Sequence, residues 1–93
     1  MNTRFDLSTV TDPTEVRIEG HNLIVRPGST KGGRYWQLLT TDGVRVGMVA
    51  EHWVRVLGRT RQVFEATYGD QQLPALSANA AARLIAQALG VAS

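Results

Sequence analysis

Hydrophobic and polar residues alternate with a period of two over much of the chain. Val16 and Ile18 alternate with charged residues, and Leu23–Arg26 is apolar and β-branched. Alternation of this kind is typical of half-buried strands. Gly20–Asn22 lies between the two runs and has the composition of a turn. We therefore expect an antiparallel hairpin here, preceded by at most one helical turn at Asp12–Glu15.

Three more runs have the pattern of strands. Arg34–Thr40 is aromatic and apolar, whereas apolar and polar residues alternate in Val44–Val49 and in Gln62–Tyr68. Asp42 and Gly43, which separate the first two runs, are a strong signal for a tight hairpin turn. These runs predict further antiparallel strands joined by short turns.

Two stretches between and after these runs are harder to assign. Ala50–Leu57 has features of both a helix and a strand, and its valines favour a strand from about Trp53 to Leu57. Gly58–Thr60 then predicts a turn. Gln71–Leu76 contains Pro74, which disfavours regular strand pairing, so this stretch is predicted to be an extended linker.

The last part of the chain predicts a helix. Ser77 is a typical N-cap residue, and the alanines and leucines of Ala78–Leu89 are strong helix formers. Gly90 stands where a helix is expected to stop. The positions predicted to face the core are Ala81, Leu84, Ile85, Ala88 and Leu89.

Together these elements predict an α+β fold in two layers, with an antiparallel sheet of four to five strands packed by one C-terminal helix. Residues 1–11 are expected to form a loosely ordered N-terminal segment, and residues 12–93 a single domain. The layout resembles that of several small nucleic-acid-binding modules, including the arm-binding domains of phage integrases. The resemblance is one of topology and involves no shared motif.

Composition narrows the class of protein further. The chain has 43% hydrophobic and 19% charged residues, as ordinary globular domains have, and it contains no cysteine. Disulfides, thiolate catalysis and cysteine zinc sites are therefore excluded. No apolar run approaches the ~18 residues that a membrane span requires. We expect a cytoplasmic protein that does not interact with membranes.

The charge of the chain is only mildly basic. Ten basic residues face eight acidic ones, which gives a formal charge of +2, and nine of the ten basic residues are arginine. Arginine suits planar contacts with phosphates, carboxylates or guanine. The alternative explanation for the arginine excess is codon bias in a GC-rich genome.

The segment Pro27–Gly33 has the composition of a phosphate-binding loop. Gly28 and Gly33 have the glycine spacing of a P-loop, but Arg34 and Tyr35 follow where that motif needs lysine and a small hydroxyl residue. A P-loop must also open a helix, whereas a strand is predicted here. Nucleotide binding is therefore excluded. Two interpretations remain: a nucleic-acid backbone contact through Lys31 and Arg34, or a flexible joint between two hairpins.

A second basic group surrounds the turn predicted at Gly58–Thr60. Arg59 and Arg61 would project from this hairpin tip, while Arg45 and Arg55 would lie on an exposed sheet face. Both tryptophans, Trp36 and Trp53, are expected in the core because large aromatic side chains supply much of the buried area of a small domain. The alternative for Trp53 is an exposed position beside an arginine, which would suit base stacking.

Signatures of catalysis and metal binding are missing from the sequence. His21 and His52 are the only histidines and lie far apart along the chain, so a zinc site is not expected. The serines show no nucleophile-elbow pattern. We therefore expect a non-enzymatic protein that needs neither a cofactor nor a metal.

Two functions fit these features. The first is a small nucleic-acid-binding module, with double-stranded DNA as the partner. Its predicted contacts are Lys31, Arg34, Arg45, Arg55, Arg59 and Arg61. The second is a protein-interaction or homo-oligomerisation module that pairs through an edge strand, as a small bacterial or phage accessory or inhibitor protein would.

Overall fold

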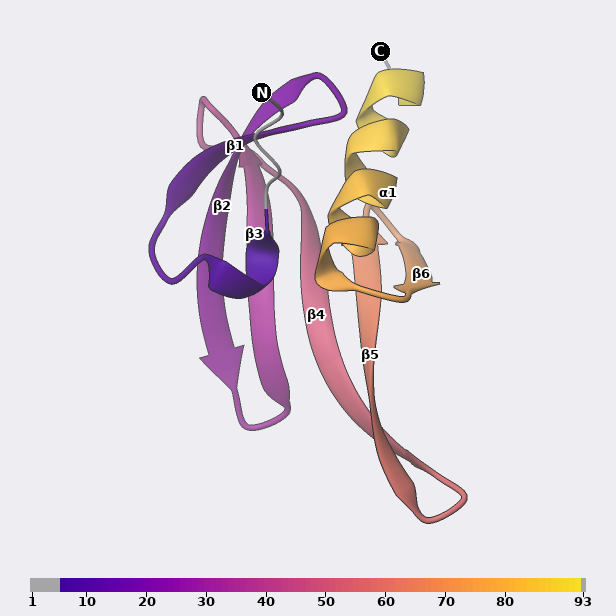
Figure 1. Ribbon diagram of the computed structural model, residues 1–93. Coiled ribbons are helices and arrows are strands. Elements are labelled where there is room, and N and C mark those ends of the chain that lie inside the picture. Colours follow the sequence, from indigo (N-terminus) through magenta and orange to yellow (C-terminus); the bar gives the residue numbers. More distant parts are fainter. Residues whose placement is uncertain (1–5, 93) are drawn as a thin grey trace.

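The computed structural model describes residues 6–92 and has the α+β architecture in two layers that the sequence predicts (Figure 1). An open antiparallel sheet of six strands is packed on one face by a C-terminal helix. The elements in chain order are the short 3-10 helix η1 (Leu7–Thr9), β1 (Thr14–Ile18), β2 (His21–Thr30), β3 (Gly33–Thr40), β4 (Arg45–Val56), β5 (Arg59–Tyr68), β6 (Gln71–Ala75) and α1 (Ala78–Ala92).

The six strands lie side by side in their order along the chain, and each is antiparallel to the next. Four of the five connections are two-residue turns, at 19–20, 31–32, 57–58 and 69–70, and only β3 and β4 are joined by a longer loop. In the β4–β5 turn both Leu57 and Gly58 have positive φ angles, of 52° and 77°. Two-residue turns of this kind match the right-handed twist of the strands that they join.

The core lies between α1 and the sheet. Trp36 of β3 is its largest side chain and is only 1% exposed, and alternate residues of the neighbouring strands surround it. Gly47 of β4 lies directly under the helix, because a Cβ atom at this position would come within 2.7 Å of Ile85. The absence of a side chain at Gly47 therefore lets α1 approach the sheet closely.

The N-terminal segment joins the same core. Leu7 of η1 is fully buried, and its backbone N–H donates a hydrogen bond of 2.9 Å to Oδ1 of Asn79 in α1. Leu7 belongs to the residues 1–11 that the sequence analysis separated from the domain. Residues 1–5 of that segment lie outside the described residues.

The expectation of a loop at Pro27–Gly33 is wrong. β2 continues to Thr30, and the turn consists of Lys31 and Gly32 alone. Strand pairing uses backbone hydrogen bonds. A run of glycine and serine can therefore pair as a strand where neighbouring side chains fill the space that its own small side chains leave. Gly28 lies opposite Tyr35, whose ring occupies the space of the missing side chain.

The expectation of an extended linker at Gln71–Leu76 is also wrong in part. Gln71–Ala75 forms β6, which pairs with β5 at the edge of the sheet. Proline is tolerated on an edge strand because a backbone N–H that points outward has no partner to lose. The ambiguous stretch Ala50–Leu57 is a strand up to Val56, continuous with the preceding run.

Several boundaries differ from the sequence prediction. The single helical turn that the sequence allows at Asp12–Glu15 does not form, since β1 begins at Thr14. The turns predicted at Gly20–Asn22 and at Gly58–Thr60 each lie one to two residues earlier, at 19–20 and 57–58.

The C-terminal helix begins where the sequence predicts. Ser77 caps α1, since its Oγ accepts the N–H of Ala80 and its carbonyl accepts that of Ala81. Gly90 does not stop the helix, which continues to Ala92. Ala81 and Ile85 are buried as expected, and the small Ala82 and Ala86 are buried beside them. Within residues 6–92, no helix combines the length and apolarity that a bilayer crossing requires.

Candidate nucleic-acid interface

The hairpin of β4 and β5 extends beyond the rest of the sheet. β3 pairs with β4 only as far as the Tyr35–Ala50 pair, and β6 pairs with β5 only from Phe64 onwards. Residues 52–63 therefore form a two-stranded ribbon without a third strand on either side, which we call the β4–β5 arm. Figure 1 shows the arm projecting from the end of the sheet, and the molecule is accordingly elongated, at 42 × 27 × 26 Å.

The two faces of the arm have different side chains. Val54 lies opposite Arg61, and Val56 lies opposite Arg59, so valines and arginines share one face. On the other face Trp53 lies opposite Gln62, and Arg55 lies opposite Thr60. Each face thus combines cations with apolar surface.

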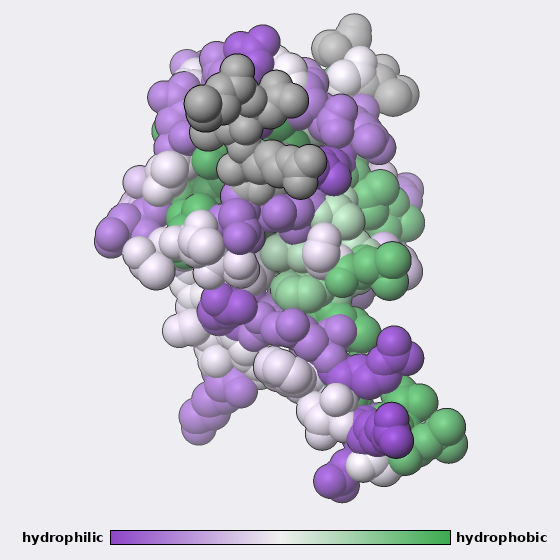
Figure 2. Space-filling view, in the orientation of Figure 1, coloured by the Kyte–Doolittle hydropathy of each residue, from purple (hydrophilic) through white to green (hydrophobic). Residues whose placement is uncertain are grey.

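Large apolar side chains on the arm are exposed to solvent. Trp53 is 56% exposed, and Leu57 at the tip is 99% exposed. Figure 2 shows hydrophobic surface next to strongly hydrophilic surface at the end of the arm. Val54 and Val56, next to Leu57, are exposed as well, and clustered apolar exposure of this kind is typical of interaction sites. The expectation that Trp53 lies in the core is wrong, because the arm extends beyond the helix and beyond the strands β3 and β6 that flank its base.

The net positive charge of the protein lies on the arm, although seven of the ten basic residues are elsewhere in the chain. Arg55, Arg59 and Arg61 lie within it, and residues 52–63 contain no aspartate or glutamate, so the formal charge of the arm is +3. Since the whole chain has a formal charge of +2, the remaining residues together have −1. The weakly basic overall charge thus conceals a cationic arm on a nearly neutral body.

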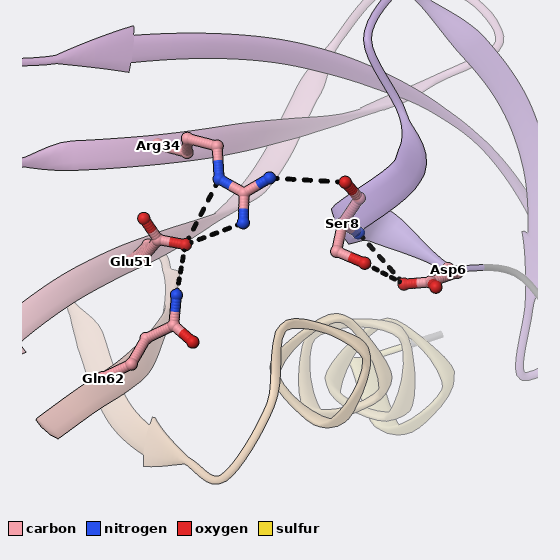
Figure 3. A network of polar contacts seen from close by, with 5 residues as sticks. All are labelled: Asp6, Ser8, Arg34, Glu51 and Gln62. Atoms are coloured by element: carbon pink, nitrogen blue, oxygen red, sulfur yellow. Dashed lines mark hydrogen bonds and ion pairs between the residues drawn. The ribbon is translucent and has the colours of Figure 1, made fainter.

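A network of polar contacts fixes the base of the arm (Figure 3). Arg34 of β3 donates two hydrogen bonds to Oε2 of Glu51, from Nη2 at 2.9 Å and from Nε at 3.2 Å. Gln62 of β5 donates a third to the same oxygen, at 2.6 Å. Glu51 is 6% exposed, so these contacts compensate a carboxylate that is almost completely buried. The network therefore joins β3, β4 and β5 at the place where β3 stops pairing with β4.

The charge state of Glu51 follows from two opposed effects. Burial alone would raise the pKa of its carboxyl group. The hydrogen bonds and positive charge of Arg34, together with the hydrogen bond from Gln62, outweigh that penalty and hold the pKa below its ordinary value. The carboxylate therefore stays ionised at neutral pH and anchors both partners.

Arg34 also connects the arm base to the rest of the fold. Its Nη1 donates to the backbone oxygen of Ser8 in η1 at 3.3 Å, and its guanidinium carbon lies 5.1 Å from the centroid of the Trp36 ring. Although the side chain is 47% exposed, its guanidinium group is thus engaged within the protein. Arg34 contributes to the position of the arm more directly than to any outer surface.

The six predicted contact residues occupy three places. Arg55, Arg59 and Arg61 are brought together on the arm, and Lys31 lies in the β2–β3 turn at the same end of the sheet. Arg34 is at the arm base. Arg45 begins β4 at the opposite end, about 33 Å of extended chain from Arg55. The structure therefore brings together Arg55, Arg59 and Arg61 on the arm, leaves Lys31 and Arg34 elsewhere at the same end of the sheet, and separates Arg45 from all of them.

Sequence reasoning missed Leu57 as part of this site. Leu57 and Gly58 form the turn, whereas the sequence pattern predicts it at Gly58–Thr60. The available signal was a residue pair ending in glycine between two alternating runs, which is the pattern of a two-residue hairpin turn. Residues with that pattern usually include asparagine or aspartate, so a leucine there is unexpected.

The two histidines lie at different places in the sheet. His21 begins β2, and His52 lies in the first pair of the arm, with its Nε2 3.8 Å from Oε1 of Glu65. Among the described residues, no three potential metal ligands come together. Comparison with protein-family models, curated proteins and solved structures finds no match for this chain.

Proposed function

We propose that this protein is a small non-enzymatic nucleic-acid-binding module that contacts double-stranded DNA through the β4–β5 arm. One observation carries the proposal: the arm has a formal charge of +3 and no acidic residue, while the rest of the chain has −1. A surface of this kind attracts the phosphate backbone of DNA, which provides most of the sequence-independent affinity of such proteins. Such a module would act in the cytoplasm, where DNA is accessible in a bacterium.

The shape of the arm supports the same partner. Two-stranded β-ribbons bind DNA by lying in its major or minor groove. Arg59 and Arg61 lie two residues apart on one strand, and Arg55 projects from the opposite face of the ribbon. A ribbon in a groove can therefore place arginines toward both flanking backbones. Lys31, at the same end of the sheet, is placed for a further phosphate contact.

The test is the salt dependence of binding to a fluorescein-labelled duplex, followed by anisotropy. Phosphate contacts by the three arginines of the arm predict that log K falls with log salt with a slope of about −2.7, and a fourth contact by Lys31 makes the slope about −3.6. The variant with Arg55→Gln, Arg59→Gln and Arg61→Gln should lose binding at moderate salt. Its charge-matched control carries Arg17→Gln, Arg26→Gln and Arg45→Gln, three exposed arginines outside the arm. Equal losses in both variants, or no binding by the wild type at low salt, would contradict the proposal.

The second candidate function, pairing with a protein partner or a second copy, has one specific observation in its favour. Residues 52–63 leave backbone N–H and C=O groups along both outer edges of the arm without a strand partner in the sheet. Edges of this kind can pair with another strand. Light scattering and the anisotropy titration together distinguish the two candidate functions. A stable dimer by light scattering that shows no DNA binding at low salt would favour strand pairing.

A further inference from the structure

Leu57 combines features that the fold does not explain. It is 99% exposed, so its side chain contributes nothing to the core. It also has a φ of 52°, in the left-handed region that is unfavourable for residues with a Cβ atom. Asparagine or glycine would suit this turn position better. An apolar side chain that is both exposed and conformationally disfavoured indicates a role outside the fold.

The turn between β1 and β2 provides an internal comparison. Glu19 has nearly the same backbone conformation, with a φ of 51°, and is likewise followed by a glycine. Glu19 is exposed, as a charged side chain in a surface turn is expected to be. The left-handed conformation alone therefore does not distinguish Leu57. The distinction is that Leu57 exposes an apolar side chain at the farthest point of a projecting arm.

The charges beside Leu57 indicate which class of partner its side chain contacts. Arg59 and Arg61 follow it within four residues, and Arg55 precedes it by two. An apolar tip flanked by cations fits DNA, where stacked bases lie between two rows of phosphates. It does not fit an ordinary apolar protein pocket, because arginines at the rim would be desolvated without an acidic partner.

We propose, on the basis of the DNA-binding function above, that Leu57 is a wedge that inserts between base pairs from the minor groove and kinks the duplex. Proteins that bend DNA from the minor groove use leucine and other apolar side chains in this way. From His52 to Leu57 the arm extends about 17 Å at ~3.3 Å per residue, and the minor groove is ~7.5 Å deep. The arm is thus long enough for its tip to reach the bases while Arg59 and Arg61 contact the backbones beside the opened step.

The experiment uses a duplex of about 30 base pairs with fluorophores at both ends and a central TA step, which is among the most easily kinked steps. A fluorescent adenine analogue at that step reports unstacking. The wild-type protein should raise energy transfer between the ends and brighten the analogue. Leu57→Asn keeps the left-handed turn, because asparagine tolerates it. This variant should bind within about threefold of wild type, since the phosphate contacts remain, but should neither bend the duplex nor unstack the step.

Glu19→Asn is the control for the turn conformation, because it introduces asparagine at the equivalent left-handed position of a turn outside the arm. It should bind and bend DNA as the wild type does. If the wild type binds in a salt-dependent manner without bending, or if Leu57→Asn bends DNA equally well, the wedge is refuted while the DNA-binding function stands. If the wild type does not bind the duplex at low salt, the DNA-binding function itself fails.

Discussion

Arg34 of β3 and Glu51 of β4 form an ion pair at the base of the arm. Two nitrogens of the Arg34 guanidinium group donate to one oxygen of the Glu51 carboxylate, at 2.9 and 3.2 Å. The two residues lie on adjacent strands, immediately beyond the last backbone pair between β3 and β4, Tyr35–Ala50. The side chains thus continue the connection between β3 and β4 after the backbone ladder has ended. The position of the arm depends on this pair and on Gln62.

The first prediction concerns the pH dependence of stability. The pKa of Glu51 in the folded protein lies below its ordinary value of 4.5. The ionised network therefore contributes fully above the unfolded pKa, and its contribution is lost as the pH falls through the folded pKa. We expect the free energy of unfolding to decrease between about pH 5 and pH 3, and this decrease to be smaller in Glu51→Gln.

Urea denaturation across this pH range measures the effect. At pH 7 Glu51→Gln should cost about 1–2 kcal/mol, since it weakens hydrogen bonds to a charged group whose partner Arg34 is half exposed. Glu19→Gln, in an exposed turn, is the control and should follow the wild-type profile. Identical pH profiles for wild type and Glu51→Gln would show that the network does not stabilise the fold.

The second prediction concerns the contact between helix and sheet. Gly47→Ala would place a Cβ atom 2.7 Å from Cγ2 of Ile85 and 2.9 Å from the carbonyl oxygen of Thr67. Both the Ile85 side chain of the helix and the backbone of β5 must then shift, and we expect a loss of about 1–3 kcal/mol in the free energy of unfolding. Gly32→Ala is the control, because its nearest neighbour would be 3.7 Å away. A Gly47→Ala protein as stable as the control would mean that α1 does not lie as closely on β4.

The third prediction concerns the local stability of the arm. A two-stranded ribbon without a third strand is marginally stable, so amides of residues 53–62 should exchange with deuterium much faster than those of β3. Leu57→Asn relieves the left-handed strain at the turn and should slow exchange at Val56 and Arg59. Exchange followed by two-dimensional NMR tests both expectations. Faster exchange in Leu57→Asn would show that the leucine stabilises the arm.

The fourth prediction separates the two tryptophans. Trp36 is 1% exposed, so Trp36→Ala should cost about 3–5 kcal/mol. Trp53→Ala should change stability by less than about 1 kcal/mol, because its side chain lies on the exposed arm. Acrylamide should quench the fluorescence of Trp53 strongly and that of Trp36 weakly, and added DNA should protect Trp53 from quenching. Quenching that DNA does not change would count against contact between this face of the arm and DNA.

The sequence pattern predicted the elements with strong local signals. The cap at Ser77 and the alanine-rich run specify α1 locally, and the alternation of Phe64, Ala66 and Tyr68 specifies the inner face of β5. The pattern failed where a neighbouring strand decides the conformation. β6 forms in spite of Pro74, because it lies at an edge.

The candidate site was predicted only in part for the same reason. Arg59 and Arg61 were predicted at a hairpin tip because the local turn signal is strong. The exposure of Trp53 depends on where β3 and β6 stop, and no pattern within the arm carries that information. The hydrogen bonds between Arg34 and Glu51 likewise depend on the pairing of two strands, because these residues are 17 positions apart in the sequence. Local sequence therefore identifies the cationic residues but not their environment.

The strand order has a consequence for how the chain folds. Because every strand pairs with the next one along the chain, the whole sheet can form by successive closures of short loops, each with a small entropic cost. Local contacts of this kind favour rapid folding. Closing the two layers is the step that spans the greatest distance along the chain, since Leu7 and Asn79 are 72 residues apart. The docking of α1 and η1 is therefore expected to be a late event that sets the folding rate.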